Sequence, residues 1–323
     1  MFTFIVIVFM AFIITFLSTS FLIPRLKRSG ITGKDINKPD APEIPEMGGI
    51  AIVAGFSAAL LLAIFFNTFN GFTFNIIYLL AAIITIHAVS FIGVVDDLIN
   101  MPQWLKALLP LFAAVPLVAV KAAVSTQLAI PFFGAIDFGI IYIIILIPLA
   151  IAVCSNLTNM LAGFNGMESG MGIVIFAVMS ILSFVHGRIE ALVISLAMFG
   201  SLLAFLFFNR YPAKIFPGDV GNLTIGAALA AVVVVGNLET AGVILILPYS
   251  IDFFIKAYNR FPSSKWWGEF KDGKLYPVDE KIRGFAQFIM KRMGGVSETK
   301  LVLIFVAIEL LFGLISLFLF LKF

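Results

Sequence analysis

Ten long apolar segments, separated by polar stretches, constrain what this 323-residue chain can fold into. Hydrophobic residues make up 61% of the sequence, charged residues only 12%, and the mean hydropathy is +1.11. A soluble core cannot bury that much apolar surface, whereas a segment of roughly 20 apolar residues suits a helix that crosses a bilayer. The segments are also too long, and alternate too little, for the strands of a membrane barrel.

The sequence therefore predicts an all-α polytopic membrane protein, with residues 1–323 forming one integral-membrane domain. Several of the predicted spans are short, which suggests helices that end early around a cavity. The ten predicted spans are Phe2–Pro24, Gly48–Phe66, Asn75–Val95, Lys106–Ala122, Gly139–Ser155, Met171–His186, Ile189–Phe208, Gly221–Gly236, Ala241–Asn259 and Lys300–Leu321.

Basic residues predict the orientation of these spans. Of the 21 Lys and Arg residues, all but Lys121, Arg188 and Lys322 lie in, or at the edges of, the loops after odd-numbered spans. Positively charged loops remain in the cytoplasm, so these loops are expected inside and both termini outside. No internal repeat is evident, which argues against a transporter built from inverted repeats.

The unusual polar clusters all fall in the same five loops. Even-numbered loops show nothing comparable, and Val124–Phe138 is expected to form a short external hairpin. Five such loops on one face predict a cytoplasmic active site at the membrane surface. The clusters are Gly30–Gly49, the pair Asp96 and Asp97 with Lys106, Asn156–Gly170, Asn209–Asn222 and the long segment 260–299.

Asp96 and Asp97 follow directly on an apolar segment. Two acids at the mouth of a hydrophobic span are costly to place, which indicates a function. Adjacent carboxylates suit a divalent hard cation and an anionic substrate that the cation bridges. Lys106 and the cations of the fifth loop could neutralise phosphates. The alternative is a helix that leaves the membrane and ends in solvated charge.

The third loop combines amides with glycines. Asn156, Asn159 and Asn165 supply hydrogen-bond donors and acceptors, and Gly163 permits a tight turn or the close approach of a ligand. The alternative is a glycine-rich turn between two helices.

The fourth loop places Asp219 in a tight turn, Gly218–Gly221, just before a helix. Phe216 offers an aromatic face at the same place, unless it serves only for packing. Three aspartates and an amide oxygen could hold one Mg²⁺ and leave positions for phosphate oxygens and water.

The fifth loop, 260–299, contains apolar residues at helical spacing between cations. This pattern predicts an amphipathic helix in the membrane interface, which either guides an anionic lipid headgroup or anchors the loop. Before it, Asp252 precedes Lys256 by four residues, as in a local ion pair, although a place at a cavity wall is the alternative. The helical pattern comprises Ile282, Phe285, Phe288, Ile289 and Met293, flanked by Lys281, Arg283, Lys291 and Arg292.

Together these motifs resemble the polyprenyl-phosphate N-acetylhexosamine-1-phosphate transferases, a family of ten-span membrane enzymes. The similarity covers nearly the whole chain and is greatest to the branch that uses UDP-N-acetylglucosamine and dolichyl phosphate. The motifs that carry it are KDINK with IPE in the first loop, DDLIN followed by Lys106 in the second, NMLAGFNGMESG in the third and RYPAKIFPGD in the fourth.

The resemblance implies a reaction in which a polyprenyl phosphate attacks the β-phosphorus of a UDP-sugar and releases UMP. It implies Mg²⁺, with Mn²⁺ as a substitute, bound by Asp219 and Asn159. It places Asp96 and Asp97 near the lipid phosphate, with Asp96 as the candidate base, and makes Lys106 a phosphate contact.

The resemblance also implies residues that bind the nucleotide sugar, with Phe216 stacking on uracil and Asn165 contacting the nucleoside. Bacterial members have a histidine-rich motif in the fifth loop, where this chain has no histidine. The dolichyl branch has an arginine-rich segment there, to which Arg260 and Lys265 are the nearest equivalents. The further candidates for nucleotide-sugar binding are Asn156, Glu46, Lys38 and Gly163.

The expected partners are a UDP-sugar, a polyprenyl or dolichyl phosphate and membrane lipid, with a homodimer as an option; a net charge of only +3 suggests no nucleic acid. An archaeal-type plasma-membrane enzyme of glycan assembly is expected rather than one of the endoplasmic reticulum. The alternatives are a bacterial-type undecaprenyl-phosphate transferase and a lipid or sugar-phosphate transporter, although a transporter would place its charges nearer mid-bilayer.

Overall fold

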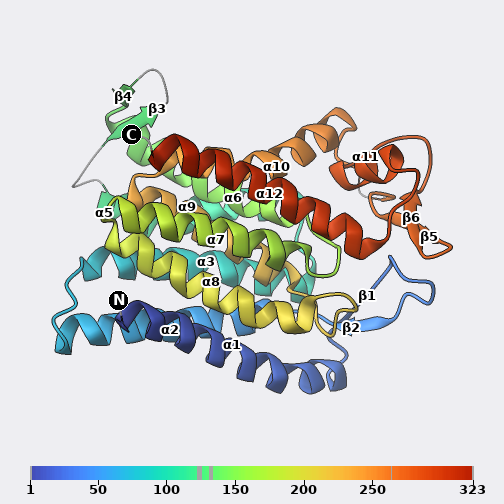
Figure 1. Ribbon diagram of the computed structural model, residues 1–323, viewed down its shortest axis with the longest axis horizontal. Helices are drawn as coiled ribbons and strands as arrows, with labels where there is room; N and C mark the ends of the chain where they lie inside the picture. Colours follow the sequence, from blue (N-terminus) through green and yellow to red (C-terminus); the bar gives the residue numbers. More distant parts are fainter. Residues whose placement is uncertain (1, 122–125, 131–133, 263, 322–323) are drawn as a thin grey trace.

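The computed structural model describes residues 2–121, 126–130, 134–262 and 264–321, and it confirms a helical membrane protein (Figure 1). Ten helical segments in these residues are long and apolar enough to cross a membrane, as predicted. The helices are α1 (Phe2–Arg28), α2 (Gly49–Phe69), α3 (Ile76–Ile99), α4 (Gln103–Ala113), α5 (Val115–Lys121), α6 (Ile147–Met160), α7 (Met167–Val185), α8 (Ile189–Asn209), α9 (Gly218–Gly236), α10 (Glu239–Tyr258), α11 (Phe285–Arg292) and α12 (Glu298–Leu321).

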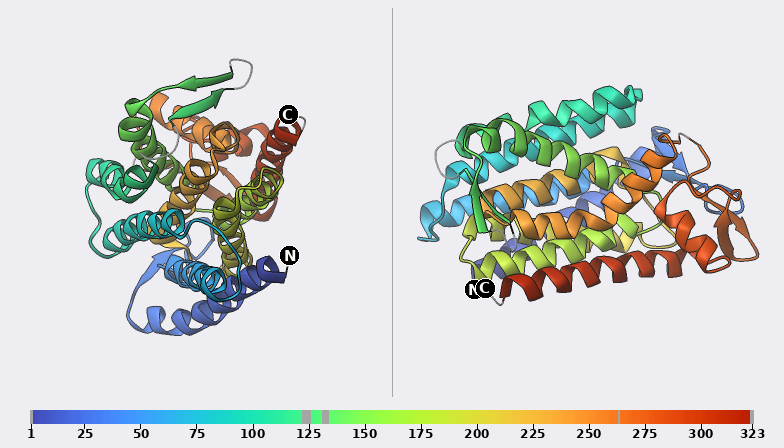
Figure 2. Two further views of the ribbon diagram at one scale, coloured as in Figure 1. Left: turned by 90° about the vertical axis from the view of Figure 1, so that its left-hand side faces the viewer. Right: turned by 90° about the horizontal axis from the view of Figure 1, so that it is seen from above.

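Helix α9 forms the centre of the bundle and packs against α3, α6 and α8 (Figure 2). Its sequence consists largely of Gly, Ala and Val, and it is buried on every side, as expected for a helix that is apolar all round. The approach of α3 is especially close, because a Cβ atom on Gly93 would lie 2.4 Å from the Cα atom of Val220. Glycine at position 93 is therefore what permits this packing.

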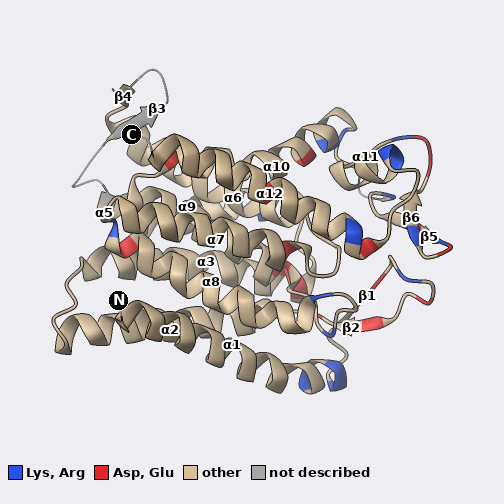
Figure 3. Cartoon of the chain, in the orientation of Figure 1, with Lys and Arg blue, Asp and Glu red and all other residues tan. Residues whose placement is uncertain are grey.

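The two ends of the bundle differ (Figures 1 and 2). One end carries α11 and two short antiparallel hairpins, β1–β2 (Thr32–Lys34 and Glu43–Pro45) and β5–β6 (Gly268–Lys271 and Lys274–Pro277). At the other end lie the start of α1, the end of α12 and the hairpin β3–β4 (Gln127–Ile130 and Gly134–Asp137). Lys and Arg residues gather at the first end, which we call the charged end (Figure 3).

The charged end thus holds the five loops that follow odd-numbered spans, as predicted. That this end faces the cytoplasm stays a prediction. The hairpin expected within 124–138 is present as β3–β4, where Gln127 pairs with Asp137. Residues 124, 125 and 131–133 of that segment, and residue 122 at the end of the fourth predicted span, lie outside the described residues.

The helices do not end early at the charged end, contrary to the expectation from the short apolar segments. Helix α3 continues past Val95 to Ile99, and α6 continues past Ser155 to Met160. Helix α9 begins at Gly218 and α7 at Met167, so several of the polar residues assigned to the second, third and fourth loops lie on terminal helical turns. The reason is that these side chains find partners inside the protein, so the helix need not end where the apolar sequence does.

Two spans are irregular because of proline. The fourth is divided into α4 and α5 at Ala114, two residues before Pro116, which cannot donate a backbone hydrogen bond. The fifth begins with a wide helical turn at Tyr142–Leu146 (η1), directly before α6, whose second residue is Pro148. A wide turn of this kind accommodates a proline whose ring would otherwise collide with the preceding turn.

The fifth loop is more ordered than predicted. The amphipathic helix exists as α11, and its buried face, with Ala286, Ile289 and Met290, turns toward the protein. Phe288 and Met293 remain exposed. Its position in a membrane interface stays a prediction.

Candidate active site

A cavity of about 1050 Å³ lies at the charged end, between α4, α6, α9 and α10 and the loops above them. Its wall combines polar groups with apolar side chains from the membrane spans. Seven of the residues proposed from the sequence line it, namely Lys106, Asp219, Asn159, Asn156, Phe216, Glu46 and Gly163.

Lys106 joins two aspartates that are far apart in the sequence. Its ammonium Nζ lies 2.6 Å from Oδ2 of Asp96 and also contacts the carboxylate of Asp219. The second oxygen of Asp96 accepts a hydrogen bond of 2.7 Å from the backbone N–H of Met101. Because Lys106 and Asp96 are buried, each charge requires the other, and the arrangement fixes one positive group between two negative ones.

Asp97 has a different place from its neighbour. Its two oxygens accept backbone hydrogen bonds from Asp219 at 2.8 Å and Val220 at 3.1 Å, in the first turn of α9. The first N–H groups of a helix have no partner within the helix, so a carboxylate there satisfies them and matches the positive end of the helix dipole. Asp97 thus holds the backbone of Asp219 in place and, among the described residues, does not line the cavity.

Asp219 and Asn159 provide hard oxygen donors, the type that Mg²⁺ prefers. Asn222, which also lines the cavity, donates from Nδ2 to Oδ1 of Asn159 at 3.2 Å. Its own Oδ1 is buried without a hydrogen-bond partner among the described residues. This donor set fits a cation that completes its coordination with phosphate oxygens and water. Within the described part of the chain, no group of three His, Cys, Asp or Glu residues could hold a metal alone.

The first and fourth loops meet at Phe216. The backbone N–H of Phe216 donates to the carbonyl of Pro45 at 2.8 Å, and its carbonyl accepts from the N–H of Gly48 at 2.9 Å. These bonds fix a half-buried ring at the cavity wall. Glu46 follows Pro45 in the first loop and also lines the cavity. Burial, and then the nearby charge of Asp219, raise the pKa of its carboxyl group.

Asn165 and Lys38 lie outside the lining of the cavity as described. The side chain of Asn165 donates to Asp35 at 3.1 Å and accepts from the N–H of Ala213 at 2.8 Å, while its backbone N–H donates to Glu298 at 2.7 Å. Lys38 forms ion pairs with Asp35, at 3.1 Å, and with Glu298. These buried residues join the first, third and fourth loops to the start of α12. Asn165 and Lys38 therefore hold these loops in place beside the cavity. That either residue contacts the nucleotide directly stays a prediction.

Arg260 and Lys265 are exposed, and neither lines the cavity in the described chain. Lys256 and Trp266 line it instead from this part of the sequence. Lys256 pairs with Asp252 at 2.7 Å, as the spacing of four residues predicted, and its ammonium lies 5.8 Å from the centre of the Trp266 ring. The sequence did offer one sign that Lys256 belongs to the site: it lies at the end of a span, on the same side as the loops with the motifs.

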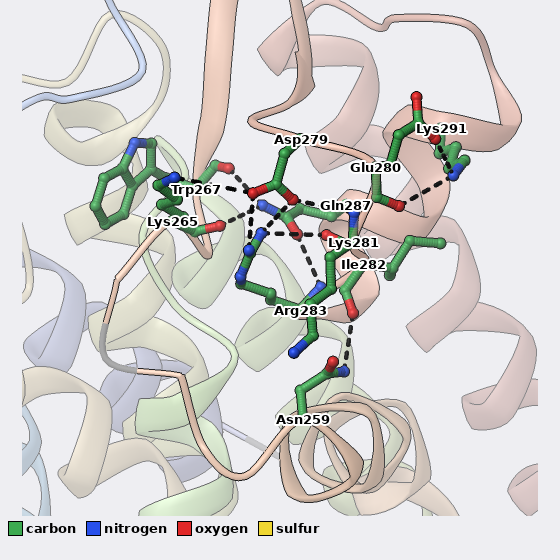
Figure 4. Close-up of polar contacts among 10 residues, drawn as sticks. All are labelled: Asn259, Lys265, Trp267, Asp279, Glu280, Lys281, Ile282, Arg283, Gln287 and Lys291. Carbon is green, nitrogen blue, oxygen red and sulfur yellow. Dashed lines mark hydrogen bonds and ion pairs between the residues drawn. The ribbon is translucent and has the colours of Figure 1, made fainter.

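Trp266 is held from two sides. Asn37 donates to the carbonyl of Gly163 at 2.9 Å and accepts from the N–H of Gly268 at 3.3 Å, which ties three loops together. Gln287, which is fully buried, donates to the carbonyls of the residues before and after Trp266, at 2.6 and 2.9 Å (Figure 4). The indole packs against Gly163, where a Cβ atom would lie only 2.7 Å from the ring.

Comparison with known proteins agrees with this architecture. A protein of Saccharolobus solfataricus is 39% identical over 96% of this chain and 94% of its own length, and one of Sulfolobus acidocaldarius is 35% identical over the same shares. Both are provisionally named UDP-N-acetylglucosamine–dolichyl-phosphate N-acetylglucosaminephosphotransferases. A phospho-N-acetylmuramoyl-pentapeptide-transferase of Halalkalibacterium halodurans is 27% identical over 96% of this chain. Residues 79–237, which run from the first turn of α3 to the end of α9, match the profile of glycosyl transferase family 4. The chain belongs to glycosyl transferase family 4.

Proposed function

We propose that this protein transfers N-acetylglucosamine-1-phosphate from UDP-N-acetylglucosamine to a polyprenyl phosphate of the dolichyl type, and releases UMP. The observation that supports this most directly is the cluster in which Lys106 and Asp219 line one cavity and Asp96 pairs with Lys106 behind its wall, in a chain 39% identical to a relative with that name. Such a cluster suits phosphoryl transfer, which depends on placing phosphates and stabilising their charge.

The apolar part of the cavity suits the prenyl chain. Side chains of three membrane spans line it, including Leu108 and Leu111 of α4, Val153 of α6 and Phe253 of α10. A lipid whose chain lies against these residues extends its phosphate toward Lys106 and Asp219, which line the same cavity.

The polar part of the cavity suits the nucleotide sugar. We assign the uracil to Phe216, because its ring is fixed at the wall and base–aromatic stacking is favourable for any base. Lys106 and Lys256 both line the cavity, and we assign the contact with the phosphates of both substrates to Lys106. Asn156 and Gly163 contribute polar groups beside them.

In the proposed reaction, an oxygen of the lipid phosphate forms a bond to the β-phosphorus of the donor. The bond from the β-phosphorus to the bridging oxygen breaks, and UMP leaves with that oxygen. Asp96 accepts the proton of the lipid phosphate where this group arrives protonated. A Mg²⁺ ion, held by Asp219 and Asn159, would neutralise charge on the diphosphate; we expect Mn²⁺ to substitute for it.

We place the enzyme in the plasma membrane of a prokaryote, with the charged end in the cytoplasm, where UDP-sugars are made. The basic loops at that end support this orientation. The product would be the first membrane-linked intermediate of a glycan.

Purified protein should release UMP from UDP-N-acetylglucosamine when dolichyl phosphate and Mg²⁺ are present. Asp219→Ala should abolish this release while the fold is retained, and Asp219→Asn should remain poor because an amide lacks the charge. Lys271→Gln, which changes an exposed residue of β5, is the control. Normal turnover by Asp219→Ala, or activity after full chelation of divalent ions, would disprove the metal assignment. A strict preference for undecaprenyl phosphate would favour the bacterial type of transferase.

A further inference from the structure

A second concave surface lies beside the active site, between the last turns of α10 and the segment that leads into α11. This groove has a volume of about 690 Å³. One face of α10 forms its floor with Ile251, Phe254 and Tyr258, which follow one another at helical spacing and are exposed. Ile282 and Phe288 close the opposite side.

The groove crosses the end of a membrane span. Helix α10 qualifies as a span as far as Tyr258, so the lower groove borders the apolar part of a bilayer. The upper rim consists of the polar residues Asn259, Glu280 and Lys281. A surface that is apolar below and polar above matches the boundary where lipid chains meet their headgroups.

The unpaired charges at and beside the rim are positive. Among the described residues, the ammonium of Lys281 has no ion pair, and the guanidinium of Arg292 contacts only the ring of Phe288, 5.4 Å away. The acidic residue of the rim, Glu280, is paired with Lys291 at 2.7 Å (Figure 4). One unpaired cation, Lys281, therefore lines the apolar groove, and a second, Arg292, lies against Phe288 of its wall, as expected for a site that binds an anionic amphiphile.

The rim is also fixed in position. Asn259 donates from its side chain to the carbonyl of Ile282 at 2.8 Å, which ties the end of α10 to the segment before α11 (Figure 4). On the other side of that segment, Arg283 makes two hydrogen bonds to Asp279, at 2.6 and 2.8 Å. The cation at position 281 is therefore held over the groove by its neighbours on both sides.

We propose that this groove binds one anionic phospholipid of the surrounding membrane, with an acyl or isoprenoid chain on α10 and its phosphate at Lys281 and Arg292. This site is distinct from the acceptor site, whose phosphate must reach Lys106. The two are adjacent, because Phe254 lines both the groove and the active-site cavity. A bound lipid therefore supports the wall against which the prenyl chain lies.

The test counts lipids bound to the full-length protein by native mass spectrometry, with phosphatidylglycerol in competition with phosphatidylcholine. Lys281→Gln/Arg292→Gln should weaken phosphatidylglycerol binding by about fivefold for each cation removed. Lys271→Gln/Lys274→Gln, on the β5–β6 hairpin, removes the same charge from the same loop and should bind as the unmodified protein does. Ile251→Trp, which fills the groove and keeps both cations, should also weaken binding.

Equal phosphatidylglycerol binding by the two double variants would overturn the proposal, as would equal binding of both lipids. If inorganic phosphate displaced the lipid fully and Ile251→Trp had no effect, the cations would form a phosphate site and the lipid proposal would be wrong. The assay needs neither UDP-sugar nor turnover, so it can fail or succeed independently of the proposed transferase activity.

Discussion

Lys106 balances two carboxylates that belong to different helices, α3 and α9. Lys106→Met would leave Asp96 and Asp219 without a partner cation. Removal of one partner from a buried ion pair costs roughly 3–5 kcal/mol of stability. We therefore expect a clear fall in melting temperature together with loss of UMP release.

The double variant Lys106→Met/Asp96→Asn separates the loss of stability from the loss of UMP release. It removes one of the uncompensated charges, so part of the melting temperature should return, whereas activity should not. Recovery of both would show that Lys106 is needed for folding only.

Glu46 makes the stability of the metal-free protein depend on pH. Its pKa is raised, chiefly by burial and then by Asp219, so the ionised form destabilises the fold. The stability linked to this group is full below the unfolded pKa of about 4.3 and falls as the pH rises toward the folded pKa. At neutral pH and in chelator, Glu46→Gln should thus melt at a higher temperature than the unmodified protein.

The difference in melting temperature should shrink as the pH falls toward about 4, where Glu46 is protonated in both states. A constant difference across that range would contradict the pKa assignment. Activity supplies a second measurement, because turnover should fall in Glu46→Gln if the carboxylate helps to bind the nucleotide sugar.

Asp96 and Asp97 show how far residue roles can be predicted. The sequence indicated that both acids were functional, since two carboxylates at the end of an apolar segment need partners. It could not distinguish them. Neighbouring residues on a helix point about 100° apart, so one meets Lys106 and the other the first turn of α9. Their difference depends on where α9 lies, which no local pattern encodes.

Helix boundaries and hairpins were the least predictable elements. The apolar segments located the spans, but the terminal turns of α3, α6 and α9 depend on contacts between helices. The hairpin β5–β6 has a local signal in the sequence, the pair Asp272 and Gly273. Asp272 and Gly273 both have positive φ, at 48° and 77°, as the Asp-Gly pair of a tight hairpin requires.

Gly163 gives a prediction about the third loop. Its φ is +111°, and a Cβ atom there would collide with Trp266. Gly163→Ala should therefore shift the indole in the cavity, lower kcat/KM for UDP-sugar by about tenfold or more (about 1.4 kcal/mol), and change the tryptophan fluorescence.

Gly187→Ala is the matched control for this substitution. Gly187 also has a positive φ, of +65°, but nothing lies within 4 Å of the position of its Cβ atom. Both variants should lose about 1–3 kcal/mol of stability from backbone strain, while the fluorescence and kinetic changes should occur only at Gly163. Equal kinetics in the two variants would show that Trp266 has no influence on the donor.

At the scale of the whole molecule, the ten spans of the described residues bring the start of α1 and the end of α12 to one end of the bundle and the five motif loops to the other. This part of the fold was predictable from hydropathy and loop order alone. The central position of α9 was not predictable. Its small residues indicate close packing, but they do not show which helices pack against it.

The orientation of the bundle is open to a direct measurement. Ser264 is exposed at the charged end and Arg188 is exposed in the turn at the opposite end. In a Cys154→Ala background, Ser264→Cys should react with a membrane-impermeant thiol reagent only after the cells are opened. Arg188→Cys should react in intact cells. The reverse pattern would invert the topology and move the proposed active site outside.

The burial of α9 on every side has a consequence for how this protein tolerates change. Helices at the rim, such as α1 and α12, keep a lipid-facing stripe on which one apolar side chain can replace another. Helix α9 has no such stripe. In a library of all single substitutions selected for activity, the rim helices should show tolerance that rises and falls once per turn. Along α9 the intolerance should be continuous, so that the helix is recognisable from sequence variation alone.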